Sequence, residues 1–366
     1  MDVLEAKRAL SAGCRRQWAR LISEMNSFIY SGFVASSFLF SSIRATQVSP
    51  AALASQYTLT TSTSLPFPTE TLSSSNAQSL IDSEWSLSKG RIQDQASDLA
   101  FVANPFLDSS SNSSSPVLQV TYPAGSYSHN TGGSQFENLW NTTDGSAFQS
   151  MSLSYEVAFD ENFDWVLGGK LPGLRGGTNA TGCSGGDEPT GLDCFSTRLM
   201  WRPDGAGEVY AYIPTTSAFC QESNITCNPD FGVSISRGSF TFVSGEWNRV
   251  TLFVQMNDPV TTANGDLQLY FNDQLVISRQ DLQFRKGSSV DINGLYFSTF
   301  FGGSDNSWAT PNTTHTYYRN MQLWGGANPS NATAVNSTVN SALKTIRSLD
   351  YLFILTSILA TWGIVL

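Results

Sequence analysis

The stretch CFSTRLMWRPDGAGEVYAYIP, residues 194–214, holds two short strand-like runs joined across a turn. Successive side chains of a β-strand point to opposite faces, so Ser196 and Arg198 share one face of the first run. In the second run Tyr210 and Tyr212 share a face, opposite an apolar set of Val, Ala and Ile. We therefore expect the second run to bury its apolar set and to turn its tyrosines outward into a groove.

The length of the connecting loop decides whether the arginine and the tyrosines meet. In a hairpin, a loop of three or five residues would place Arg198 on the face of Tyr210 and Tyr212, whereas a loop of four would place them on opposite faces. We expect the first arrangement.

The chain between residues 76 and 326 repeats this strand pattern. Apolar and β-branched residues recur with a period nearer two than 3.6, and the runs end at Gly, Asn, Asp or Pro. Asn272-Asp273 marks a hairpin, and one helix is predicted over 79–90. Many short strands with little helix predict an all-β domain, a two-sheet sandwich or jelly roll. The predicted strands are 117–122, 152–159, 197–201, 208–213, 249–256, 266–272 and 294–301.

The chain is acidic overall. Its 366 residues carry a net charge of −10, and only 14% are Lys, Arg, Asp or Glu. Because no basic stripe is present, we expect no nucleic-acid partner. A polyanionic substrate would then require a cleft that is itself basic, since local potential steers a ligand better than net charge does.

Cysteines and glycosylation sequons indicate a secreted protein. Four of the five cysteines cluster within 45 residues. The neighbouring pairs 183–194 and 220–227 would each close a short loop, and the other two connectivities stay open. A zinc site is disfavoured because CxxC spacing is missing and only two histidines occur. The clustered cysteines are Cys183, Cys194, Cys220 and Cys227, and the seven N-x-S/T sequons lie at Asn112, Asn141, Asn179, Asn224, Asn312, Asn331 and Asn336.

Both ends of the chain have the composition of targeting segments. We predict a leader over 1–45 with a cleavage point near Ala45, followed by a Ser/Thr-rich linker over 46–75. A polar, glycosylated stalk over 327–350 precedes the apolar tail 351–366, which resembles a signal for glycolipid anchoring. A retained tail anchor is the alternative. These features predict a protein on the outer cell surface, and we expect it to be a monomer.

The polar residues of the opening stretch suit the cleavage of a sugar acid by β-elimination. The C5 proton of a uronic acid becomes acidic only when the neighbouring carboxylate is neutralised. Arg198 and Lys170, from the upstream block DWVLGGKLPGLRGG (164–177), are the cationic candidates. A tyrosine near a cation can act as base or return a proton to the departing O4. An equally weighted alternative is that these are ordinary solvent-side strand residues.

Five separated blocks carry a resemblance to a known family. GGKLPGLRGG, FSTRLMW and EVYAYIP, together with VTYPAGSYSHNTGGSQF (120–136) and YFSTFFGGSDNSWATP (296–311), resemble the alginate and glucuronan lyases of polysaccharide lyase family 14 and their fungal, glycolipid-anchored relatives. The resemblance covers roughly residues 76–326. It implies a jelly roll of the concanavalin A-like type with an open cleft on one concave sheet.

The resemblance also implies roles. Tyr212 is the expected acid/base with Tyr210 beside it, Lys170 and Arg198 bind the substrate carboxylate, and Ser196 binds substrate or orients a partner. Gln135, in GGSQF, is a further candidate for the carboxylate or else a structural strand residue. The expected substrate is an acidic polysaccharide, glucuronan first and alginate second. An insertion over 178–194 should lie beside the site. No cofactor is expected, although a loop with Asp305 has oxygen ligands that suit calcium.

Three other functions are compatible with an all-β surface protein. A glycoside hydrolase would need two carboxylates facing the groove, and the acidic cluster at 160–164 lacks the corresponding pattern. A Ser-His-Asp hydrolase is disfavoured because His129 and His315 lie in polar, loop-like surroundings without a nucleophile elbow. A non-catalytic surface protein that binds acidic glycan remains the main alternative.

Overall fold

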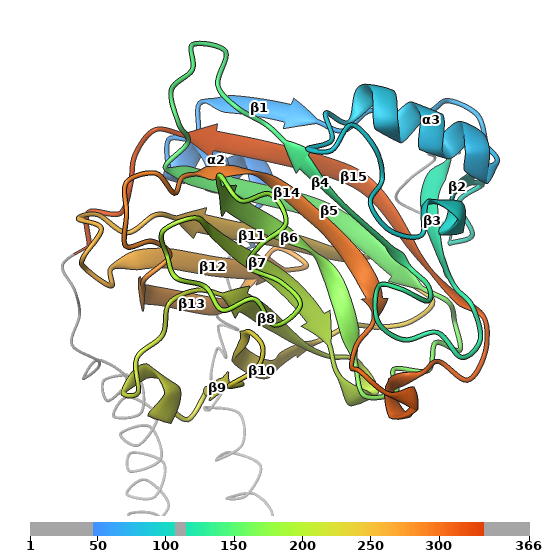
Figure 1. Ribbon diagram of the computed structural model, residues 1–366. Helices are drawn as coiled ribbons and strands as arrows, with labels where there is room; N and C mark the ends of the chain where they lie inside the picture. The colour runs from blue at the N-terminus through green and yellow to red at the C-terminus, as the bar shows by residue number, and fades with distance from the viewer. Residues whose placement is uncertain (1–46, 107–114, 333–366) are drawn as a thin grey trace, which may run out of the picture. The chain divides into compact units, whose positions relative to one another are not determined.

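The computed structural model describes residues 47–106 and 115–332, which form two stacked antiparallel β-sheets (Figure 1). The first sheet contains β1 (Thr61–Ser64), β2 (Leu99–Val102), β3 (Val117–Tyr122), β5 (Ser150–Phe159), β11 (Asn248–Gln255), β12 (Gly265–Phe271), β13 (Gln274–Leu282) and β15 (Thr314–Gly326). The second sheet contains β4 (Ser134–Leu139), β6 (Gly169–Gly177), β7 (Cys194–Trp201), β8 (Ala206–Tyr212), β9 (Ile225–Cys227), β10 (Val233–Thr241) and β14 (Ile292–Phe301).

The strand order explains how segments distant in sequence become neighbours. The first sheet runs β13-β12-β11-β5-β15-β3-β2, with β1 paired to β15, and the second runs β4-β14-β6-β7-β8-β10-β9. Consequently β6, β7 and β8 lie side by side in the middle of the second sheet, with β14 and β4 beyond β6 (Figure 1). The predicted all-β, jelly-roll sandwich is confirmed.

The core lies between the sheets and follows the predicted alternation. Leu199 of β7 and Val209 of β8 are fully buried against residues of the first sheet such as Leu252 and Leu153. Each such side chain stabilises the fold by about 1.5–3 kcal/mol relative to an exposed one. The opposite face of the same strands is thereby left to present polar side chains.

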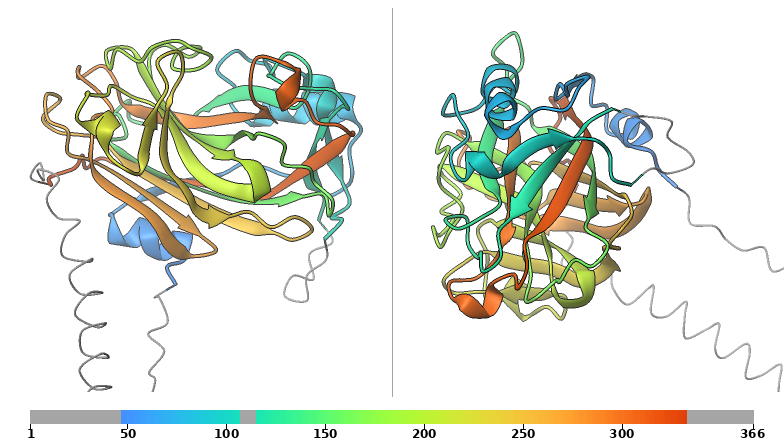
Figure 2. Two further views of the ribbon diagram at one scale, coloured as in Figure 1. Left: turned by 90° about the horizontal axis from the view of Figure 1, so that it is seen from below. Right: turned by 90° about the vertical axis from the view of Figure 1, so that its right-hand side faces the viewer.

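The Ser/Thr-rich segment predicted as a linker over 46–75 is instead folded onto the first sheet from residue 47 on. Helix α2 (Pro50–Gln56) buries Leu53 against Phe253 and Trp324 on the outer face of that sheet (Figure 2), and β1 pairs with β15. The linker prediction was wrong because a few spaced apolar residues are enough for docking, although the average composition is polar.

Two local predictions can be compared with the observed elements. The helix expected over 79–90 is α3 (Ser74–Glu84), which begins earlier and ends where Trp85 enters the core with no exposed surface. The hairpin at Asn272-Asp273 is confirmed between β12 and β13. Both turn residues have positive φ, 49° and 66°, as a two-residue turn that matches the strand twist requires.

Both nearest-neighbour disulfides are present, Cys183–Cys194 and Cys220–Cys227. Asn141, Asn224, Asn312 and Asn331 are exposed, and Asn179 is half-buried, so glycosylation at these sequons stays a prediction. The leader over 1–45, Asn112, Asn336 and the tail 351–366 lie outside the described residues. None of the helices in the described part of the chain is long and apolar enough to cross a membrane.

Candidate active site

The pairing of β7 with β8 brings the predicted residues onto one face of the second sheet. Arg198 lies opposite Tyr210, and Ser196 lies opposite Tyr212. The last pair before the turn is Trp201 with Gly207, which leaves the five residues 202–206 as the loop. The predicted same-face arrangement is therefore confirmed.

The neighbouring strands add a lysine and a glutamine. Lys170 of β6 lies opposite Met200 of β7, one same-face position from Arg198. On the other side, Gln135 of β4 lies opposite Ser298 of β14. Ser298 accepts a hydrogen bond from Arg198 Nη1 at 3.0 Å and donates to Gln135 Oε1 at 3.1 Å. Gln135 is thus connected to the arginine through a serine.

Lys170, Arg198, Tyr210 and Tyr212 border a pocket of about 420 Å³. Four cationic residues line it, and no Asp or Glu is found among the described residues of its wall. The site is therefore basic within an acidic protein, as a polyanionic substrate requires. A pair of catalytic carboxylates is missing from this wall, which argues against a glycoside hydrolase. The cations are Lys170, Arg198, Arg202 and Arg237.

Arg198 is the most unusual residue of the site. Its side chain is fully buried, and its Nε and Nη2 atoms have no hydrogen-bond partner. The guanidinium carbon lies 4.4 Å from the ring centroid of Tyr296 and 5.6 Å from that of Tyr212. Buried donors without partners are costly, whereas a carboxylate could satisfy both nitrogens at once.

The ammonium of Lys170 is enclosed by Tyr210 and Met200. Its Nζ lies 3.4 Å from the centroid of the tyrosine ring and 3.1 Å from the methionine Sδ. Desolvation first, and then the positive charges of Arg198 and Arg202, hold the pKa of Lys170 well below its usual value. At a given pH, a larger fraction of the protein molecules therefore carries Lys170 as a neutral amine than would be the case for an ordinary lysine.

A buried carboxylate beneath the pocket organises two of the cations. Glu208 has no exposed surface and accepts hydrogen bonds from Arg202 at 2.6 Å and from Arg237 at 2.7 Å. Ser234 donates to the same carboxylate at 2.6 Å. Desolvation, followed by the neighbouring Tyr212, raises the pKa of Tyr210 to about 12. Tyr210 therefore stays protonated across the ordinary pH range.

Two predicted substrate-binding residues have protein partners instead. The hydroxyl of Ser196 donates to the carbonyl oxygen of Cys183 at 2.7 Å, which matches the expected role of orienting a partner. Gln135 donates to Asp94 Oδ2 at 3.0 Å while accepting from Ser298. Neither side chain lines the pocket wall.

Sequence reasoning missed several residues of the wall: Arg202, Arg237, His129 and Trp308. Arg202 follows the predicted strand directly, so its position beside the turn was a usable signal. Arg237 reaches the site from β10, His129 from a loop and Trp308 from the 3-10 helix Asn306–Trp308, and only the tertiary fold brings these segments together. Asp305, the calcium candidate, accepts a hydrogen bond from the Ser307 N–H at 2.9 Å. Within the described ranges no group of three or more His, Cys, Asp or Glu residues is placed to hold a metal ion.

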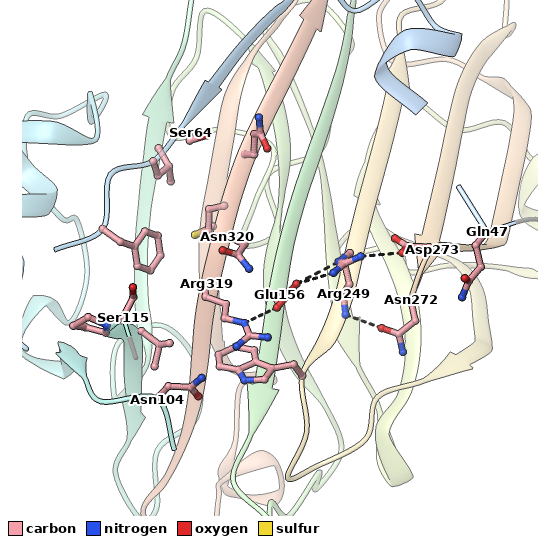
Figure 3. Close-up of a pocket in the computed structure, with 17 residues that line it drawn as sticks. Gln47, Ser64, Asn104, Ser115, Glu156, Arg249, Asn272, Asp273, Arg319 and Asn320 are labelled. Atoms are coloured by element: carbon pink, nitrogen blue, oxygen red, sulfur yellow. Dashed lines mark hydrogen bonds and ion pairs between the residues drawn. The ribbon is translucent and has the colours of Figure 1, made fainter. Parts of the chain in front are cut away.

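A second hollow of about 890 Å³ lies on the first sheet, and its charges are balanced (Figure 3). Glu156 forms ion pairs with Arg249 at 3.0 Å and with Arg319 at 2.5 Å. Arg249 also pairs with Asp273 at 2.9 Å. None of the residues predicted from the motifs borders this hollow. The pocket of the second sheet therefore differs from this hollow in holding the unsatisfied guanidinium of Arg198.

The chain belongs to polysaccharide lyase family 14, because the family model Polysaccharide lyase 14 matches residues 110–321. A marine PL-14 alginate lyase from Aplysia kurodai is 34% identical, with a TM-score of 0.59 over 71% of this chain and 100% of that chain. The protein is accordingly a polysaccharide lyase of the class that acts on uronic-acid polymers.

Two more distant structures share the fold. The alginate lyase Aly36B is 21% identical, with a TM-score of 0.54 over 74% of this chain and 98% of that chain. The alginate lyase vAL-1 from a Chlorella virus is 20% identical, with a TM-score of 0.53 over 70% of this chain and 99% of that chain. Among curated proteins, none matches the chain.

The unpartnered nitrogens of Arg198 generate a stability prediction. In Arg198→Met, the free energy of unfolding should fall by no more than about 1 kcal/mol or should rise, because the substitution removes buried unsatisfied donors. Urea denaturation without saccharide measures this free energy. Arg175→Met is the matched control. This arginine of β6 is nearly as buried, but it donates to the Asn293 side chain at 2.6 Å and to the Asn179 carbonyl at 2.9 Å and pairs with Glu137. Its loss should cost about 3 kcal/mol or more. Equal losses in the free energy of unfolding for both variants would contradict the assignment of Arg198 as a ligand-binding residue.

Proposed function

We propose that the protein cleaves a linear uronic-acid polymer by β-elimination at the pocket of the second sheet, with alginate as its first substrate and glucuronan as its second. The observation that carries this proposal is the buried Arg198 guanidinium with two unpartnered nitrogens at a pocket lined by four cations. The 34% identity to an alginate lyase supports placing alginate first, which reverses the order expected from the sequence.

The reaction needs three roles, and the pocket holds a residue suited to each. Arg198 neutralises the C5 carboxylate, so that the carbanion formed at C5 is stabilised. A base then removes the C5 proton, the C4–O4 bond breaks, and an acid protonates O4 as the chain leaves. The product carries a C4–C5 double bond conjugated to the carboxylate.

The electrostatics favour separate roles for Lys170 and Tyr212. A lowered pKa makes the neutral amine of Lys170 available as the base, in place of the carboxylate-binding role expected from the sequence. Tyr212 is then the acid that protonates O4. Tyr210, with a pKa of about 12, keeps its proton and encloses the lysine.

Access to the arginine requires a small rearrangement. Nε and Nη2 of Arg198 are shielded from solvent in the unliganded protein, although the residue borders the pocket. We infer that the incoming carboxylate displaces the side chains covering these nitrogens, since catalytic hydrogen bonds often form only in the substrate complex.

The proposed location of the protein is extracellular. Two disulfides agree with an oxidising compartment. We also propose that the apolar tail 351–366 directs glycolipid anchoring and that the protein acts as a monomer. Release of the protein from cell membranes by a phospholipase that cuts glycolipid anchors would test the anchor, and retention on the membrane would favour a retained tail.

The elimination product can be detected by its ultraviolet absorbance. Incubation with alginate or glucuronan should raise ultraviolet absorbance through the conjugated double bond, and a neutral glucan should give no rise. Tyr212→Phe should lower the rate by about 10²- to 10⁴-fold, because a phenyl ring cannot supply the proton. Tyr317→Phe is the matched control, since that hydroxyl donates to Asp160 from the first sheet. If the protein bound the glycan but absorbance did not rise on either uronate, the lyase assignment would be contradicted and a glycan-binding function favoured.

The pH dependence of kcat tests the role of Lys170. If neutral Lys170 is the base, kcat rises with pH as the lysine loses its proton at its lowered pKa. Arg202→Gln removes a positive charge that lowers this pKa, so the acid limb should move to higher pH. Arg237→Gln is the control. Arg237 also binds Glu208, through the other carboxylate oxygen, but it is not among the charges that lower the pKa of Lys170, so the acid limb should move less. A limb that stays in place, or moves to lower pH, would exclude Lys170 as the base.

A further inference from the structure

We infer that the disulfide-closed loop 183–194 is a positioning element of the active site, with Cys183 and Cys194 as positioning residues for the Tyr212 hydroxyl. This inference rests on the proposed function, in which Tyr212 is the acid. The loop is the insertion that was expected beside the site, and its Ser184 and Gly185 line the pocket.

The disulfide itself is packed against the reacting side chains. Cys183 and Cys194 are 0% and 1% exposed and form one buried cluster with Met200, Tyr210 and Tyr212. Cys194 also begins β7, two residues before Ser196, which faces Tyr212 across the strand pair. The sulfur bridge therefore joins the loop to the strand that carries Arg198.

Three hydrogen bonds connect the loop to the site. The Cys183 carbonyl accepts from Ser196 at 2.7 Å, and the Gly186 N–H donates to the Tyr212 hydroxyl oxygen at 3.4 Å. The Tyr296 hydroxyl donates to Ser184 Oγ at 3.0 Å, and the Tyr296 ring packs against the Arg198 guanidinium. The loop thus contacts the proposed acid and the side chain that covers the carboxylate-binding arginine.

The contact from Gly186 has a chemical consequence for Tyr212. A tyrosine hydroxyl carries one hydrogen to donate and can also accept hydrogen bonds. When the Gly186 N–H donates to the oxygen, the O–H hydrogen points in another direction. Because Tyr212 lines the pocket, we expect that direction to be the pocket. The hydroxyl is thereby oriented as a proton donor toward O4 of the substrate.

This backbone donor depends on a loop conformation that the disulfide restrains. Gly186 has a φ of 93°, which residues with a side chain rarely adopt. The cross-link joins cysteines 11 positions apart and limits the conformations open to the intervening chain. Without it, we expect the Gly186 N–H to lose its place over Tyr212.

The experiment is a double-mutant cycle measured on the full protein well below its melting temperature. Cys183→Ala with Cys194→Ala should lower kcat by about 10- to 100-fold, with a smaller change in KM, because a small displacement of a catalytic group is costly. In a Tyr212→Phe background the same pair should lower the residual rate by less than about twofold, because the residue being positioned is already missing.

Cys220→Ala with Cys227→Ala is the matched control. This second disulfide spans seven positions, and both of its cysteines are partly exposed. Its loss should lower the melting temperature and leave kcat within about twofold, since removing a short cross-link acts mainly on the unfolded chain. If the first pair fails to fold, reduction of the Cys220→Ala/Cys227→Ala protein tests the same bond. Because Cys183 and Cys194 are buried, thiol titration first establishes that the bond has been reduced, and kcat is then expected to fall and to recover on reoxidation.

The outcomes separate this inference from the proposed function. An equal loss of kcat in both backgrounds, or an unchanged kcat after reduction, would overturn the positioning role and leave the lyase intact. Full activity of Tyr212→Phe would overturn the assignment of the acid and this inference with it. A failure of the original protein to cleave any uronate would refute the proposed function.

Discussion

The pairing register of β7 with β8 is the constraint on which the site depends. It sets Arg198 opposite Tyr210 and Ser196 opposite Tyr212, and it keeps Val209 and Ala211 in the core. Because strand side chains alternate, a shift of one residue would turn the tyrosines from the pocket face into the core between the sheets and turn the apolar set out of that core. The same strand register therefore buries the core residues and brings the site residues together.

The buried cations of the site lower the stability of the folded protein, and favourable interactions elsewhere in the fold must offset this loss. Arg198 has two buried nitrogens without partners, and the pKa of Lys170 is lowered first by desolvation and then by the neighbouring cations. The hollow on the first sheet is the useful comparison, because there Glu156 and Asp273 balance the charges of two arginines. Uncompensated charge is what a lyase needs before a polyanion arrives, and stability is commonly given up for such function.

The sequence predicted the local order of the site well, because strand alternation is a short-range property. Ser196, Arg198 and both tyrosines fell on one face as expected, and only the loop length was open. Arg237 was not predicted, because its approach from β10 depends on long-range pairing. The folded segment before residue 75 was missed because Leu53 and a few other apolar residues outweigh its polar average. Gln135 was found, yet its connection through Ser298 required the order of β4 and β14.

The most direct test of the account is a crystal structure of the Lys170→Ala/Tyr212→Phe protein with a uronate tetrasaccharide. The account predicts one sugar carboxylate within hydrogen-bond distance of the Arg198 guanidinium, with its C5 facing the position of the lysine that was removed. A saccharide bound instead in the hollow around Glu156 and Arg249, or a pocket carboxylate that does not contact Arg198, would contradict it.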